Sequence, residues 1–107
     1  MLKDMIIIET TIFSRLIQDM MSDDDYRLLQ EALITRPDAG DVIKGSGGLR
    51  KVRWKLEGKG KSGGIRVIYY WVTADDQIRM VYAYRKSKQE NLTPEQLAAL
   101  KQIVERW

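Results

Sequence analysis

Hydrophobic and polar positions follow one another along the chain in patterns that predict three helices and four strands. Short apolar runs bounded by turn residues, which are typical of strands, occupy residues 5–9, 49–56, 65–72 and 77–84. Apolar residues at three- and four-residue spacing predict helices over residues 12–20, from Ser22 to Pro37, and from Thr93 to Trp107. This order predicts a single α+β domain over residues 1–107, with helices packed on one small antiparallel sheet.

Individual segments carry further signals about their place in that sheet. The continuous apolar run 5–9 predicts a strand buried on both faces, and the β-branched and aromatic run 65–72 predicts a central strand. Ser22 is expected to cap the second helix, and Thr93 the last one, where Pro94 and Gln96 complete a capping box. The acidic run 23–25 is expected to stabilise a helix N-terminus and not to bind a metal.

The strand predicted over residues 49–56 alternates in character. Lys51, Arg53 and Lys55 share one face of it, whereas Val52, Trp54 and Leu56 share the other. Across a glycine-rich connection, antiparallel pairing would place Arg66 beside Lys51 and Arg53. The following strand contributes Tyr82 and Tyr84, and Arg85 and Lys86 stand at its end. We therefore expect a concave basic patch with phenols on one side.

The distribution of charge strengthens this expectation. Residues 1–43 have a net charge of −5, residues 44–66 of +7 and residues 67–107 of +1, within a total of +3. Seven of the eight glycines also lie within residues 44–66, where bare backbone leaves room for close approach or for turns of positive φ. Such segregation of charge predicts an anionic partner.

Composition excludes several kinds of chemistry. The chain has no cysteine and no histidine, so disulfides, thiolate nucleophiles, Cys/His zinc sites and imidazole acid–base pairs are impossible. No apolar run approaches the roughly 18 residues that a membrane span needs. We expect a cytoplasmic protein that needs no cofactor and does not bind membranes.

The predicted patch suits RNA. Lysine and arginine neutralise phosphates, and tyrosine rings stack on unpaired bases. The same groups could also cleave RNA, because the substrate supplies its own 2′-hydroxyl nucleophile and needs only alignment, proton transfer and charge stabilisation. Composition alone leaves both binding and cleavage open.

Two long segments carry a resemblance to a known family. They are Gly45 to Arg53 (GSGGLRKVR) and Gly58 to Tyr70 (GKGKSGGIRVIYY), followed by Tyr84, Lys86 and the run Asn91-Leu92-Thr93. Together they resemble the HigB branch of the RelE/ParE toxin superfamily over essentially the whole chain. The resemblance implies a RelE-like fold and the toxin of a type II toxin–antitoxin module. It further implies a ribosome-dependent endoribonuclease (an mRNA interferase), which a HigA-type antitoxin holds inactive and which meets operator DNA only through that antitoxin.

The resemblance also implies roles for individual residues. Arg66 matches the arginine expected at the scissile phosphate, and the other catalytic positions are Lys51, Arg53, Tyr84 and Lys86. The surrounding basic residues are expected to contact RNA: Arg50, Lys55, Lys59, Lys61 and Arg85. Where relatives have Gly-Lys-Asn, this chain has Arg85-Lys86-Ser87. Two alternatives stay open, namely a ParE-like toxin that inhibits DNA gyrase and a non-catalytic RNA-binding module.

Overall fold

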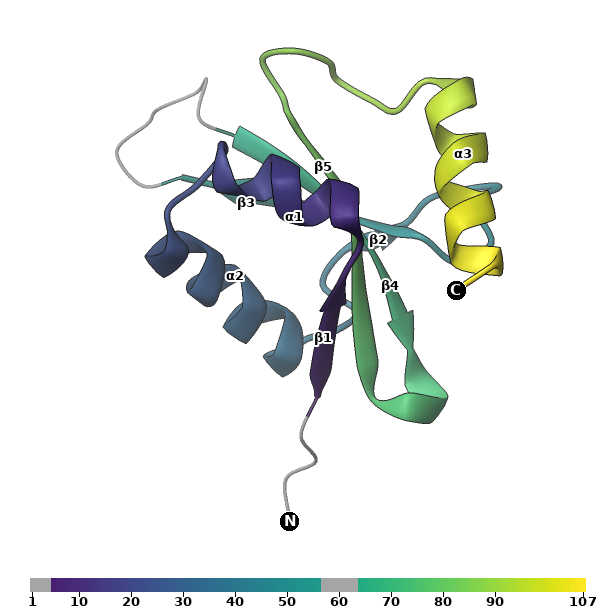
Figure 1. Cartoon of the computed structure of the whole chain (residues 1–107), viewed down its shortest axis with the longest axis horizontal. Helices are drawn as coiled ribbons and strands as arrows, with labels where there is room; N and C mark the ends of the chain where they lie inside the picture. Colours follow the sequence, from purple (N-terminus) through teal and green to yellow (C-terminus); the bar gives the residue numbers. More distant parts are fainter. Residues whose placement is uncertain (1–4, 57–63) are drawn as a thin grey trace.

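One five-stranded sheet with helices on both of its faces forms the protein (Figure 1). The structure is a computed structural model and describes residues 5–56 and 64–107. Its strands are β1 (Ile6–Glu9), β2 (Asp41–Val42), β3 (Arg50–Lys55), β4 (Gly64–Val72) and β5 (Gln77–Arg85). Its helices are α1 (Thr11–Gln18), α2 (Asp23–Thr35) and α3 (Pro94–Glu105), and a short 3₁₀ turn, Thr73–Asp75, joins β4 to β5. The predicted α+β class is confirmed.

The sheet has the order β1-β5-β4-β3-β2, with antiparallel pairing from β2 to β5. β4 is central, as its β-branched and aromatic composition predicts. β1 instead pairs parallel to β5 at the sheet edge, so the sheet is mixed and not wholly antiparallel. The prediction that this strand is buried on both faces is wrong, because Ile6 on this edge strand is 56% exposed.

Each face of the sheet has its own hydrophobic cluster. α1 and α2 cover one face, where Phe13, Leu29 and Leu33 pack with residues such as Val67 and Tyr69. α3 covers part of the other face, where Leu100 packs with Leu49, Ile68, Val81 and Tyr84. Figure 1 shows α1 and α2 together on one side of the sheet and α3 on the other. The rest of the α3-bearing face, beyond this helix, is where the candidate site lies.

Capping side chains start the helices where the sequence predicts. Ser22 Oγ accepts a hydrogen bond from the Asp25 backbone, and Thr93 forms a complete capping box with Gln96. α1 begins one residue earlier than predicted and is capped by Thr10, whose hydroxyl accepts from the Phe13 backbone. No described helix has the length and apolar character needed to cross a membrane.

The glycines that precede β3 shape a turn. Gly45, Gly47 and Gly48 have φ values of 75°, 76° and 111°, a region that side chains disfavour. Inside this turn, the buried Ser46 hydroxyl bonds the carbonyl oxygens of Ile43 and Leu49. Of the two roles expected for glycine-rich backbone, turn geometry therefore explains these three.

Candidate functional site

Side chains of β3, β4 and β5 form rows across the α3-bearing face, since directly paired residues project from the same side of a sheet. In the middle row, Arg66 pairs with Arg53 on one side and with Tyr84 on the other. The antiparallel pairing predicted for Arg66 is thus confirmed. It brings two guanidinium groups and a phenol together at the centre of the sheet.

The rows on either side add three lysines. Lys55 pairs with Gly64, whose carbonyl oxygen accepts a hydrogen bond of 3.0 Å from the backbone N–H of Lys86. Lys51 pairs with Ile68, which pairs in turn with Tyr82. We call this surface the basic face, and its residues are Lys51, Arg53, Lys55, Arg66, Tyr82, Tyr84 and Lys86. It collects all five residues for which a catalytic role was predicted.

Arg66 is the least exposed cation of the basic face, with 8% of its surface accessible. Within residues 5–56 and 64–107, its guanidinium has neither a hydrogen bond nor an ion pair with a carboxylate. Asp41, which is opposite Lys51 on β2, forms no ion pair with that lysine either. A nearly buried cation without an internal partner is costly, so this arrangement favours an anion that arrives from outside.

Tyr84 lies beside Arg66 and is 4% exposed. Its hydroxyl is buried and has no hydrogen-bond partner among the described residues, which is rare in folded proteins. Burial raises the pKa of Tyr84 above its ordinary value, although the nearby Arg66 charge opposes that shift. The phenol is therefore protonated at neutral pH and carries a hydrogen-bond donor that the protein itself does not use.

A loop before α3 supports one edge of the basic face. Lys51 Nζ donates a hydrogen bond of 3.1 Å to Asn91 Oδ1. Gln96, which also caps α3, donates to the Tyr82 hydroxyl at 3.4 Å, and the Tyr82 and Tyr84 rings lie 6.2 Å apart. These contacts orient Lys51 and Tyr82. Both residues of this support, Asn91 and Gln96, were noted in the sequence for other reasons, and their contacts with the basic face depend on tertiary structure that no local pattern predicts.

A hollow of about 520 Å³ extends the basic face at the edge of the sheet. It lies between β2 and β3 and is lined by Ala39, Asp41, Val42, Ile43, Lys51, Val52 and Arg53. Since Lys51 and Arg53 line this hollow and also belong to the basic face, an extended polyanion could follow them from one to the other.

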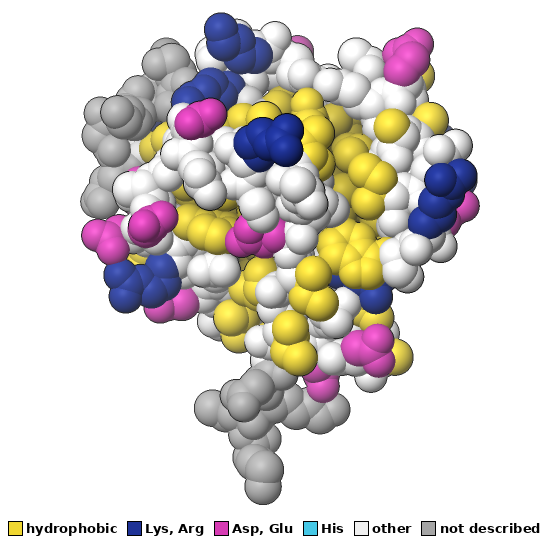
Figure 2. Space-filling model, in the orientation of Figure 1, with side chains coloured by type: hydrophobic (Ala, Val, Ile, Leu, Met, Phe, Trp, Pro, Cys, Tyr) yellow, Lys and Arg dark blue, Asp and Glu magenta, His cyan; other side chains and the backbone are white. Residues whose placement is uncertain are grey.

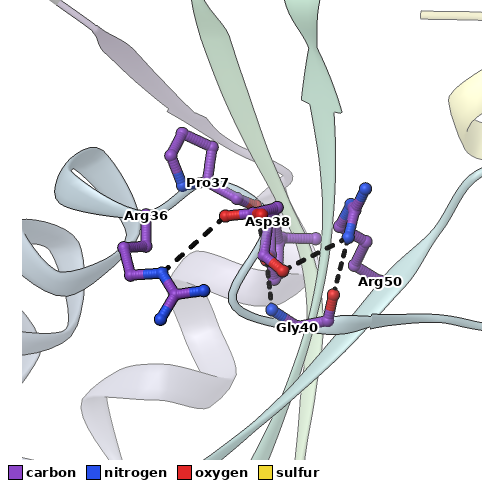
Figure 3. A network of polar contacts seen from close by, with 6 residues as sticks. Arg36, Pro37, Asp38, Gly40 and Arg50 are labelled. Carbon is purple, nitrogen blue, oxygen red and sulfur yellow. Dashed lines mark hydrogen bonds and ion pairs between the residues drawn. The ribbon is translucent and has the colours of Figure 1, made fainter.

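Two arginines expected at the RNA lie on the opposite face. Arg50 donates hydrogen bonds to the carbonyl oxygens of Gly40, at 2.8 Å, and Asp38, at 3.4 Å (Figure 3), and its guanidinium lies 5.9 Å from the Trp71 ring. Arg85 donates to the carbonyl oxygen of Asp19 at the end of α1. The expectation that Arg85 joins the basic patch is wrong, and for both arginines an RNA contact stays a prediction that their positions do not support.

Two further lysines were predicted to contact RNA. Lys59 and Lys61 lie outside the described residues. On the face drawn in Figure 2, Lys and Arg side chains are interspersed with Asp and Glu side chains and with hydrophobic ones. Among the described residues, no group of three or more His, Cys, Asp or Glu side chains is arranged to hold a metal ion.

Comparison with known proteins identifies the family. Residues 5–107 match the family model described as the RelE toxin of the RelE / RelB toxin–antitoxin system. The chain belongs to the RelE family. It is therefore a toxin of a toxin–antitoxin module, and membership of the family implies an antitoxin partner.

A solved structure agrees with the fold of this RelE-family chain. A mutant of the E. coli toxin RelE in the free state matches it with a TM-score of 0.58 at 13% sequence identity, over 95% of this chain and 96% of that one. This likeness supports the fold described above.

Proposed function

We propose that this toxin is a ribosome-dependent endoribonuclease that cuts mRNA on the basic face. The observation that carries the proposal is the central Arg66–Tyr84 pair, in which a nearly buried guanidinium and a buried phenol both lack an internal partner. Each is a hydrogen-bond donor at neutral pH, and a phosphate oxygen accepts from both. Four further cations surround the pair, which suits a substrate with a repeating negative charge.

RNA supplies the nucleophile in the proposed reaction. The 2′-oxygen attacks the adjacent phosphorus while its proton passes to a base. The 5′-oxygen then leaves with a proton from an acid, and a cyclic 2′,3′-phosphate remains on the upstream fragment. Arg66 holds the non-bridging oxygens, whose negative charge grows in the pentavalent transition state. No metal enters this scheme.

Acid and base must stand on opposite sides of the phosphorus, because the attacking and leaving oxygens are in line. The rows of the basic face meet this need, since Lys51 lies in the row on one side of Arg66 and Lys86 in the row on the other. We assign proton transfer to these two lysines. Arg53 and Lys55, which are both exposed, hold the neighbouring phosphates.

Tyr84 takes part only after a local change. Its hydroxyl is buried in the structure, so its surroundings must open when RNA binds before the hydroxyl donates to the phosphate or the ring stacks on a base. Catalytic hydrogen bonds often tighten only in the substrate complex. This requirement agrees with a toxin that acts on RNA already held in place by the ribosome.

The expected antitoxin is a HigA-type protein, on the grounds of the HigB-like segments around Gly45 and Gly58. Such an antitoxin would inhibit the toxin and bring it to operator DNA. Because the chain needs no membrane contact for this function, we place its action in the cytoplasm.

Toe-printing on purified ribosomes tests the function. With an mRNA bound to the ribosome, the chain is expected to produce new 3′ ends inside the coding region, and free mRNA is expected to stay intact. Intact ribosome-bound mRNA combined with DNA breaks after induction would instead support the gyrase alternative. Salt-dependent RNA binding without cleavage or growth arrest would support a simple binding module.

A further inference from the structure

Gly64 occupies an unexpected position at the start of β4. It pairs with Lys55 on β3 and accepts a hydrogen bond from the Lys86 backbone, so it stands on the basic face between two lysines. A Cβ atom built on Gly64 would lie 3.5 Å from Arg66 Nη1, 3.8 Å from Lys86 Cβ and 3.9 Å from Lys86 Cδ. The missing side chain thus leaves a space next to Arg66 and Lys86, with Lys55 directly opposite on the paired strand.

Neither backbone nor packing requires glycine there. Gly64 does not adopt a positive φ, unlike the three glycines of the turn before β3. The distances around the built Cβ are ordinary van der Waals contacts, so an alanine fits without a clash. In addition, glycine weakens a strand compared with other residues, and β-branched residues favour one. Folding alone would therefore favour a side chain at this position.

We propose that the backbone of Gly64 forms the base of a binding site for one RNA phosphate. Lys55, Arg66 and Lys86 surround this site, which we call the phosphate seat. A phosphate oxygen bound to a guanidinium lies roughly 2.7–2.9 Å from its nitrogen. A methyl group 3.5 Å from Arg66 Nη1 would compete for that place. Gly64 is thus a positioning residue, and this inference rests on the proposed function, since it locates the substrate within the same face.

A graded series of substitutions tests the seat. Gly64→Ala, Gly64→Val and Gly64→Leu add increasing bulk at one position and remove no charge. We expect the single-turnover rate of mRNA cleavage on ribosomes to fall by less than about tenfold for Ala and by about 100-fold or more for Leu. The urea midpoint of unfolding is expected to stay the same or to rise for Val, because the strand gains a β-branched residue.

A cleavage rate that falls while the unfolding midpoint stays the same or rises would show that Gly64 serves the activity. A glycine needed only for the fold would lower both quantities when it is replaced. Ala74→Leu, which adds bulk at the exposed 3₁₀ turn at the far end of β4, is the matched control and should leave both quantities unchanged. Cleavage by Gly64→Leu at the wild-type rate would overturn the inference. Unfolding of Gly64→Ala or Gly64→Val would overturn it as well, since the glycine would then serve the fold.

A binding measurement separates this inference from the proposed function. The probe is a short 2′-deoxy oligonucleotide. It carries the same phosphates as RNA but lacks the 2′-hydroxyl nucleophile, so it binds and is not cut. If the wild-type chain cleaves no RNA yet Gly64→Leu weakens binding of the probe about tenfold or more, the nuclease proposal fails and the phosphate seat stands. If the wild-type chain cleaves and Gly64→Leu changes neither rate nor binding, the nuclease proposal stands and the seat fails.

Discussion

The two faces of the sheet use arginine and tyrosine in opposite ways. On the face covered by α1 and α2, Arg50 bonds the carbonyl oxygens of Asp38 and Gly40. Tyr69 on the same face donates to the Pro37 carbonyl at 2.7 Å and accepts from the Gly40 N–H at 2.8 Å. On the basic face, neither Arg66 nor the Tyr84 hydroxyl has a partner among the described residues.

Hydrogen bonding thus distinguishes a polar side chain that serves the fold from one that is available to a ligand. A buried polar group that is satisfied internally stabilises the fold, whereas one left unsatisfied lowers stability and needs another explanation. The contrast is not complete, because the Tyr82 hydroxyl on the basic face accepts a hydrogen bond from Gln96. In addition, the buried Trp71 Nε1 on the helix-covered face lacks a partner among the described residues. That group is an isolated N–H, however, and not part of a cluster of cations.

Removal of Arg66 is expected to have the largest effect on activity. Arg66→Ala deletes the contact to the oxygens that gain charge in the transition state, which corresponds to about 3 kcal/mol, or about two decades in cleavage rate. Stability should change little or rise, because a nearly buried and unpaired charge is lost. Single-turnover cleavage on ribosomes and urea unfolding measure the two effects.

Growth arrest provides the matching test in cells. Expression of Arg66→Ala should no longer stop growth, and the variant should still bind its antitoxin. A folded Arg66→Ala protein that remained fully toxic would contradict the functional difference between the faces, since Arg66 would then be no more important for activity than Arg50.

The two tyrosines form a matched pair for the next test. Tyr84→Phe removes a hydroxyl without an internal partner, so cleavage should slow about tenfold or more while stability is unchanged or slightly higher. Tyr69→Phe leaves a buried N–H at Gly40 unsatisfied and should lower the free energy of unfolding by about 1–3 kcal/mol without slowing cleavage. Equal effects of both variants on cleavage, or on stability, would contradict the distinction between the faces.

Much of the fold and of the basic face follows from two regularities of the sequence. A period of two in residues 49–56 places Lys51 and Arg53 on one side, and antiparallel pairing brings Arg66 and then Tyr84 into the same row. These predictions hold because side-chain parity and hydrogen-bonded register are local properties. The capping residues Ser22 and Thr93 were predictable for the same reason.

Two kinds of prediction failed. Some basic residues were assigned to the patch by their charge, without regard to the face of the strand on which they lie. Other features depend on tertiary contacts that no local pattern contains. The alternation that puts Lys51 on the basic face puts Arg50 and Val52 on the helix-covered face. Arg85 is next to Tyr84 in β5, so it also points to the helix-covered face, opposite to Tyr84. The two-residue strand β2 is too short to have a pattern. The edge position of β1 depends on its parallel pairing with β5, which links residues far apart in the sequence.

Neutralisation of Arg50 and of Lys55, which lie on opposite faces of β3, is expected to affect different quantities. Arg50→Met loses two hydrogen bonds to backbone and the contact with Trp71, so the free energy of unfolding should fall by about 1–2 kcal/mol with cleavage retained. Lys55→Met removes an exposed charge and should instead raise the apparent KM for RNA about threefold to tenfold, with stability within about 0.5 kcal/mol. If Arg50→Met weakened RNA binding as much as Lys55→Met does, Arg50 would be an RNA contact after all.

The smallest expected effect concerns Asn91, which gives Lys51 a partial internal partner. Asn91→Ala removes one exposed hydrogen bond of 3.1 Å, so the cleavage rate should fall only about twofold to threefold as Lys51 becomes less well oriented. Asn91→Asp should act differently, because its carboxylate would bind the ammonium group and compete with phosphate, which raises the apparent KM. Kinetics over a range of RNA concentrations separate the two results, and Asn91→Gln is the neutral control.

One outcome would limit the role of Lys51. If Asn91→Asp bound RNA as tightly as Asn91→Gln does, Lys51 would not need to be free of an internal anion. The contrast between the two faces would then rest on Arg66 and Tyr84 alone.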